Sequence, residues 1–222
     1  MRNASSMLEL VVAIVVMGIA MMTLPLMLTT TQKNNTFAMR QEAIYAARTQ
    51  ISDMLTYFWD ENSVDANLSF GVLDTNSTNN IFERVPGTIR RIGHAKRNKR
   101  RKYFTSTTYA TSPANLGKDG IEATPNDIDD FSTGVPTTIQ PSTQNADIGF
   151  DYKYILNMTT TVSYIDDNFT SGSTFDFNTS TMLNSTNIKM STLTITNNND
   201  FNITLRAYSS NIGASQLLRR DF

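Results

Sequence analysis

The sequence predicts an α+β protein, in which one long N-terminal helix packs on a C-terminal antiparallel sheet. An uncharged apolar run opens the chain, an amphipathic stretch continues it, and segments that alternate apolar and polar residues lie near its end. A length of 222 residues suits one domain plus an anchor. We divide the chain into a leader at 1–4, an apolar transmembrane helix at 5–31, an amphipathic helix at 32–61, and an exported, β-rich domain with long loops at 62–222.

The apolar helix is expected because no charged residue lies between Leu10 and Leu28. A run of about 20 apolar residues spans a bilayer as a helix. Glu9 stands at the head of this run, where a carboxylate is costly unless it has a partner. A cleaved secretory signal has a shorter apolar core and a small-residue exit site. A plain membrane anchor explains the length of the run but leaves Glu9 unexplained.

The helix is predicted to continue beyond the apolar run as an amphipathic one. Apolar residues recur every seven positions at Phe37, Ile44, Ile51 and Phe58, with Ala47, Met54 and Leu55 on the same side. This stripe predicts a helix that reaches Trp59 and packs one face on the domain. A kink is expected at Gly18 and at Pro25, since proline removes a backbone donor.

The C-terminal part of the chain predicts strands. Apolar and polar residues alternate over 150–164, which is typical of a half-buried strand. Apolar residues at alternate positions flank the polar run 197–200, which predicts a hairpin with a turn of more than two residues. Proline and glycine punctuate 111–144, which we expect to be a long loop.

The N-terminal pattern resembles that of the type IV pilin and pseudopilin family. Precursors in this family have a short hydrophilic leader, a small residue, and a five-residue stretch ending in Glu before an unbroken apolar helix. Ala4 takes the last leader position, Ser5 the mature N-terminus and Glu9 the hallmark acid. Gly18 also matches, whereas Ser5 stands where Phe is usual and Pro25 lies one position before the common proline. The resemblance covers only the leader and the apolar helix.

This resemblance implies a structural filament subunit with a pilin-like fold. A prepilin peptidase would cut after Ala4, and the new amine of Ser5 would be methylated. The precursor would sit in the bacterial inner membrane and then join other pilin subunits in a periplasmic or extracellular filament, either a pilus or a secretion pseudopilus. Glu9 would pair with the Ser5 amine of its own or a neighbouring subunit. The departures at Ser5 and Pro25 favour a minor subunit. A non-assembling, single-pass anchored binding protein is the alternative.

A dense basic span is the strongest feature outside the anchor. It comprises Arg84, Arg90, Arg91, Lys96, Arg97, Lys99, Arg100, Arg101 and Lys102, followed by Tyr103 and Phe104. Clustered cations bind phosphates without sequence preference, and adjacent aromatic rings stack on bases, so a DNA-uptake minor pilin is one interpretation. Contact with neighbouring subunits, contact with anionic lipid, and a solvated loop are the others. We favour a subunit contact or a solvated loop.

Several asparagines stand in the Asn-x-Ser/Thr pattern of glycosylation acceptors. Five of them also have Asp two residues earlier: Asn67, Asn76, Asn168, Asn178 and Asn202. The extended pattern resembles the acceptor of bacterial N-glycosylation systems, as in relatives of Campylobacter. An Asn-, Thr- and Asp-rich chain also produces such strings by chance. Asn157 and Asn184 share the shorter pattern but lack the preceding acid.

The composition excludes several classes of chemistry. The chain has no Cys and a single His, His94, which removes disulfides, thiol catalysis and most metal sites. No phosphate-binding loop or nucleophile–base constellation is present, so we predict no enzyme and no cofactor. The acidic cluster of Asp127, Asp129 and Asp130 fits no calcium-loop spacing, and we predict no metal there.

Overall fold

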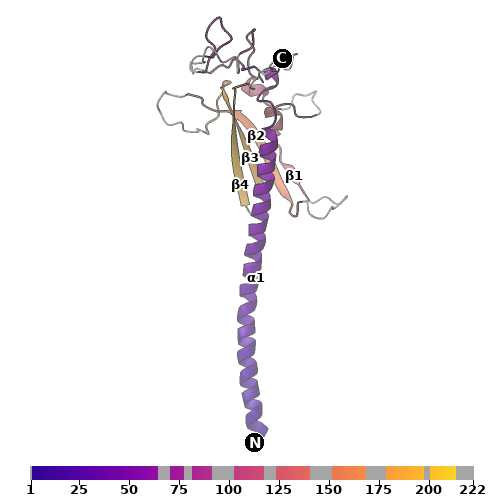
Figure 1. Cartoon of the computed structure of the whole chain (residues 1–222). Helices are drawn as coiled ribbons and strands as arrows, with labels where there is room; N and C mark the ends of the chain where they lie inside the picture. The colour runs from indigo at the N-terminus through magenta and orange to yellow at the C-terminus, as the bar shows by residue number, and fades with distance from the viewer. Residues whose placement is uncertain are drawn as a thin grey trace, which may run out of the picture.

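A computed structural model describes residues 2–64, 71–77, 82–91, 103–117, 124–140, 152–168, 179–197 and 201–213, with side chains from Met7 onward. It contains one long helix and a four-stranded antiparallel sheet, which confirms the predicted α+β class. The sheet lies beside the C-terminal part of the helix, and the N-terminal part extends far below it (Figure 1). The chain is therefore a compact head on a long helical stem.

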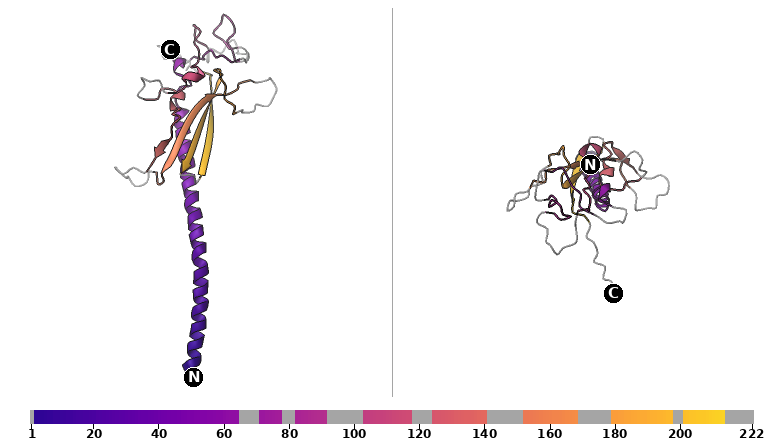
Figure 2. Two further views of the ribbon diagram at one scale, coloured as in Figure 1. Left: turned by 180° about the vertical axis from the view of Figure 1, so that it is seen from behind. Right: turned by 90° about the horizontal axis from the view of Figure 1, so that it is seen from above.

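The helix α1 spans Arg2–Met54 without a break. At about 1.5 Å per residue, such a helix is roughly 80 Å long. It continues through Gly18 and Pro25 as one element in both side views, although the proline cannot donate a hydrogen bond to Met21 (Figures 1 and 2). α1 ends before Trp59, the residue at which the apolar stripe predicted its end.

Threonine hydroxyl groups follow Pro25 on α1 and donate to carbonyls of the preceding turn. The Thr29 and Thr30 hydroxyls donate to the Leu26 carbonyl at 2.9 and 2.8 Å, and the Thr31 hydroxyl donates to the Met27 carbonyl at 2.9 Å. These bonds satisfy the hydroxyl groups inside the helix itself, so they need no water. This stretch of α1 is consequently suited to an apolar environment.

The sheet is a simple antiparallel meander in the order β1-β2-β3-β4. Its strands are β1 Thr137–Ile139, β2 Leu156–Tyr164, β3 Ile188–Asn197 and β4 Phe201–Ser210. The pairing of Asn197 with Phe201 closes the predicted hairpin, whose turn lies outside the described residues. The alternation predicted for β2 is confirmed by the burial of Leu156, Val162 and Tyr164. The short strand β1, inside the expected loop, was not predicted.

The helix packs on the sheet through alanines. Ala43, Ala46 and Ala47 form one core cluster with Leu156, Leu193, Ile195 and Phe201 of the strands. The predicted heptad stripe was therefore only partly right: Ala47, Ile51 and Met54 do face the domain. Phe37 and Ile44 are instead 63% and 45% exposed. Small side chains allow a helix to approach a sheet closely, which decides the buried face here.

Candidate functional site

The N-terminal half of α1 has no packing partner among the residues that the structure describes. Every residue from 7 to 35 is exposed, and large apolar side chains such as Met22 reach 82% exposure. This helix is long and apolar enough to cross a membrane, although an N-terminal signal sequence has the same features. Monomeric soluble proteins rarely expose so large an apolar surface, so this half of α1 is a candidate membrane-spanning or protein-binding segment.

Glu9 lies at the start of this apolar surface and is itself exposed. The described part of the chain offers Glu9 no hydrogen bond or ion pair. Ala4 and Ser5 belong to the same helix, and Ser5 lies four residues before Glu9, on the same helical face. The backbone of α1 thus places the predicted cleavage junction one turn from the acid.

A second glutamate on α1 has the opposite environment. Glu42 is half-buried, and its Oε1 accepts hydrogen bonds from the backbone N–H groups of Lys153 and Tyr154 at 2.8 and 2.9 Å. These groups lie just before β2, so Glu42 fixes the helix to the sheet domain. Glu42 therefore has partners inside the chain, whereas the described residues offer Glu9 none.

The head contains a buried ionic centre around Lys189, which lies on β3. Its Nζ donates to the Trp59 carbonyl at 2.8 Å and to Asp60 Oδ2 at 3.1 Å, and it makes a closer contact with Asp129 Oδ1. The side chains of Lys189 and Asp60 are fully buried, and that of Asp129 is nearly so. The centre joins three segments: the turn after α1, the 3-10 turn Asp129–Phe131 and β3.

Two more aspartates line the same centre. Asp127 accepts hydrogen bonds from the N–H groups of Glu61 and Asp129, each at 2.8 Å, and Asp130 accepts one from the Asn126 N–H at 2.7 Å. Burial, followed by the charge of Asp129, raises the pKa of Asp127 to about 8. No group of acidic or histidine side chains in the described ranges could hold a metal ion. In this fold Asp129 of the acidic cluster pairs with a lysine, and its neighbours bind backbone N–H groups.

Sequence reasoning identified the three loop aspartates but missed Lys189 and Asp60. The five residues come together only because β3 lies beside the end of α1 and the 3-10 turn. A local signal does exist, since Lys189 stands alone between Ile188 and Met190 at the start of a strand whose side chains are largely buried. A single lysine in such a strand predicts a buried ion pair.

The basic span is only partly visible. Lys96, Arg97, Lys99, Arg100, Arg101 and Lys102 lie outside the described residues. Arg84 forms a salt bridge with Asp74 at 2.6 Å and stacks over the Tyr103 ring at 4.6 Å. Arg91 donates to the Asn211 carbonyl at 2.7 Å. These two arginines hold the head together, so any phosphate binding would fall to the rest of the span.

The described acceptor asparagines lie at the surface. Asn76, Asn168 and Asn202 are exposed, whereas Asn67 and Asn178 lie outside the described residues. Among the two controls, Asn184 is exposed and Asn157 is half-buried. Asn184 is therefore the better matched control for modification.

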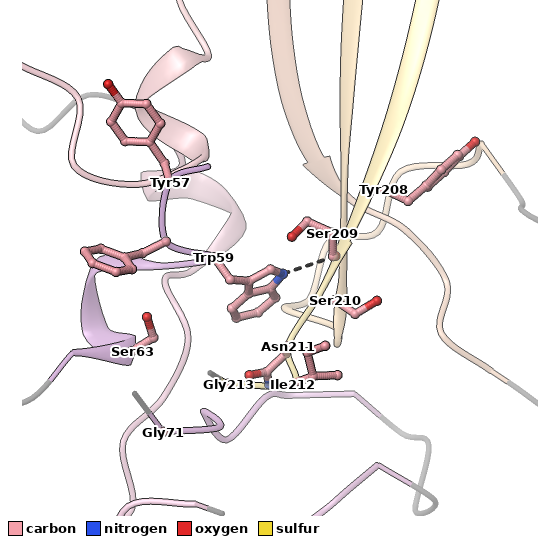
Figure 3. Close-up of a pocket in the computed structure, with 11 residues that line it drawn as sticks. Tyr57, Trp59, Ser63, Gly71, Tyr208, Ser209, Ser210, Asn211, Ile212 and Gly213 are labelled. Atoms are coloured by element: carbon pink, nitrogen blue, oxygen red, sulfur yellow. Dashed lines mark hydrogen bonds between the residues drawn. The ribbon is translucent and has the colours of Figure 1, made fainter. Parts of the chain in front are cut away.

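A surface pocket of about 460 Å³ lies between the turn after α1 and the end of β4. Figure 3 shows the Trp59 indole pointing toward β4, where its N–H donates to the Ser209 carbonyl at 3.2 Å. Ser63, Ser210 and Asn211 supply further polar groups to the lining. Trp59 also borders the ionic centre, because its carbonyl accepts from Lys189.

The fold and these sites define a head domain carried on an unpaired apolar helix. No family model, curated protein or solved structure shows significant similarity to the chain. The membrane-type helix, the two glutamates and the ionic centre therefore carry the functional proposals.

Proposed function

We propose that the chain is the precursor of a type IV pilus-like filament subunit, and that it assembles through the N-terminal half of α1. The observation that carries this proposal is the continuous exposure of residues 7–35 with Glu9 at their head. In the precursor this half-helix lies in lipid, and in the filament the same half-helices of other subunits replace the lipid. The head domain then faces the surface of the filament.

The resemblance to type IV pilins supports the steps that connect the two states. Arg2 stays on the cytoplasmic side, in line with the positive-inside rule. A prepilin peptidase cuts after Ala4, and the freed amine of Ser5 is methylated. Glu9 then pairs with that amine in a medium of low dielectric constant, where an unpaired charge costs several kcal/mol. The pair therefore sets the register between helices more than it adds stability.

Mass spectrometry of the N-terminus of the protein from its native host tests the proposal. We expect a chain that begins at Ser5 with a methylated amine. A matched Ala4→Leu variant should begin at Met1, because a bulky residue replaces the small one at the junction. A wild-type chain beginning at Met1, or beyond Leu28, would contradict the proposal, and a Met1 start would favour the anchored binding protein.

Nucleic-acid binding by the basic span is a second candidate function. It is favoured by the density of cations from Lys96 to Lys102, since Arg84 and Arg91 are already engaged inside the head. The full chain in detergent should then bind DNA with an affinity that falls steeply with salt. Charge reversal at Arg97, Lys99, Arg100 and Arg101 should abolish binding. No binding at low salt would leave the span as a subunit contact or solvated loop.

A further inference from the structure

The ionic centre places a lysine amine against a carboxyl group in a dry site. Lys189 Nζ and Asp129 Oδ1 form the closest polar contact of the centre, and both side chains are buried. The two residues come from β3 and from the 3-10 turn Asp129–Phe131, which are far apart in the sequence. From this geometry we propose that Lys189 and Asp129 join in an intramolecular isopeptide bond. The inference does not rest on the filament proposal.

The surroundings favour reaction over a simple ion pair. Lys189 Nζ lies 4.7 Å from the centre of the Trp59 ring and 5.6 Å from that of Tyr164. Such walls exclude water, so the reaction starts when a proton passes from the ammonium to Asp129 along their contact and leaves both groups neutral. The neutral amine is a nucleophile and the neutral acid an electrophile. An ammonium and a carboxylate are neither.

Asp129 is the reacting acid because Asp60 accepts more hydrogen bonds from the surrounding backbone and side chains. Asp60 accepts hydrogen bonds from the N–H groups of Asn62 and Thr111 at 3.1 and 2.9 Å, and also from the Asn62 side chain at 3.1 Å. Several donors stabilise the charged form, which resists attack at carbon. Among the described residues, Asp129 has one backbone donor besides Lys189, the Gly117 N–H at a longer 3.4 Å.

Asp127 supplies the proton-transfer group. Its carboxyl group interacts with that of Asp129, and backbone N–H groups fix its orientation. Its raised pKa, about 8, keeps it protonated at neutral pH. A buried neutral acid beside the reacting carbon can donate a proton to a departing oxygen and then recover one.

The reaction balances without any added reagent. The neutral amine of Lys189 attacks Cγ of the protonated Asp129 carboxyl, and an N–C bond forms. Asp127 protonates the hydroxyl of the tetrahedral intermediate, the C–O bond breaks, and water leaves. The nitrogen then gives up its surplus proton, which restores Asp127. Overall, one ammonium and one carboxylate yield one amide and one water, with no oxidation or reduction.

The intact mass of the full chain, produced in a host without a prepilin peptidase or N-glycosylation and purified in detergent, tests this bond. We expect a mass that is lower than the sequence mass by one water molecule. Digestion with trypsin plus chymotrypsin should yield a branched peptide, which fragmentation resolves into two segments joined through Lys189 and Asp129. An intact mass equal to that of the sequence, with ordinary tryptic cleavage after Lys189, would overturn the proposal.

Variants separate the roles of the three residues. Lys189→Arg and Asp129→Ala should each restore the full sequence mass, and Asp127→Ala should do so while both bonding partners remain. Lys153→Arg is the matched control, because Lys153 also lies over an aromatic ring, at 5.5 Å from that of Tyr154, but is exposed. The mass of the Lys153→Arg variant should still be one water molecule below the mass of its sequence. A Lys189→Arg variant whose mass is still one water molecule low would also refute the bond between Lys189 and Asp129. If a variant fails to fold, the branched peptide from the wild-type chain remains the deciding measurement.

Discussion

The two halves of α1 differ more in the size of their side chains than in their backbone. Residues 7–28 carry mostly Met, Leu, Ile and Val on all sides, and every residue of 7–35 is exposed in the described part of the chain. The later half buries Ala43, Ala46 and Ala47 against the strands. A close contact with a flat sheet needs small residues on one face, whereas lipid or a helix bundle accepts large residues all round. The comparison teaches that one continuous helix can carry two surfaces of different character, one packed on a sheet and one exposed.

The largest expected effect concerns the two glutamates that represent these halves. Glu9→Ala should abolish incorporation into filaments and leave the unfolding of the head unchanged, because Glu9 has no partner in the described part of the chain. Glu42→Ala should leave incorporation into filaments unchanged and destabilise the head. It should lower the free energy of unfolding by about 1 kcal/mol, because it removes the acceptor for two backbone donors. Filament fractionation and chemical denaturation measure the two effects.

Both variants should still be found in the membrane fraction as precursors, which serves as the common control. Normal incorporation of Glu9→Ala would contradict a role for this acid in assembly. A loss of head stability in the same variant would show that Glu9 has a partner in the head after all.

The second prediction concerns the ionic centre, which belongs to the head alone. The pKa of Asp127 is raised from 3.8 to about 8 in the folded chain, so this group binds a proton in the folded state that the unfolded state has lost. Its contribution to stability is therefore complete below pH 4 and disappears as the pH rises toward 8. The largest change that Asp127 can make to the free energy of unfolding over this pH range is several kcal/mol.

Chemical denaturation of wild type and Asp127→Ala across this pH range isolates the contribution. The difference between their free energies of unfolding should shrink steadily as the pH rises. Loss of a covalent cross-link would shift the difference equally at every pH, so the slope reports the titration alone. A flat difference would show that Asp127 is already ionised in the folded state.

The third prediction tests the packed half against the exposed half. Ala47→Leu should destabilise the head by about 1–3 kcal/mol, since overpacking a close contact forces neighbouring groups apart. Ala13→Leu is the matched change in the exposed half and should leave the unfolding of the head unaltered. Thermal denaturation of both variants in the same detergent makes the comparison. Equal effects would mean that the alanine face is not the contact that holds the helix.

The smallest expected effect concerns sugars on the head. If the acid-preceded pattern is read by a glycosylation enzyme, glycan mass should appear on Asn76, Asn168 or Asn202 and be absent from Asn184. All four are exposed, so the preceding acid is the discriminating feature. Asn67 and Asn178 carry the same expectation. We expect no change in head stability when glycosylation is lost, and an unmodified native protein would remove the hypothesis.

Much of the fold followed from the sequence because the relevant signals are local. The alternation before Tyr164 predicted β2, and the polar run from Asn197 predicted the hairpin. The buried face of α1 was only partly predicted because the alanines at that face carry a weak apolar signal. Phe37 and Ile44 carry a strong signal but remain exposed. β1 was not predicted because a strand of three residues is too short to show an alternation of apolar and polar side chains.

The ionic centre shows a different limit. Asp127, Asp129 and Asp130 were recognised as a group, but their partner lies on β3 and Asp60 lies after α1. Charge pairing over such separations depends on the packing of the whole head, which no local pattern contains. Ala4, Ser5 and Glu9 were predicted in another way, from a linear motif near the N-terminus. The experiments above test the roles that this motif implies.

The direction in which α1 joins the sheet has a mechanical consequence. In both side views the strands run alongside the C-terminal part of the helix rather than across it (Figures 1 and 2). Hydrogen bonds between strands lie perpendicular to the strand direction. A pull on the N-terminal end of α1 would reach the sheet through the alanine face and load these bonds in shear. They would then resist together, where a perpendicular pull would open them one after another.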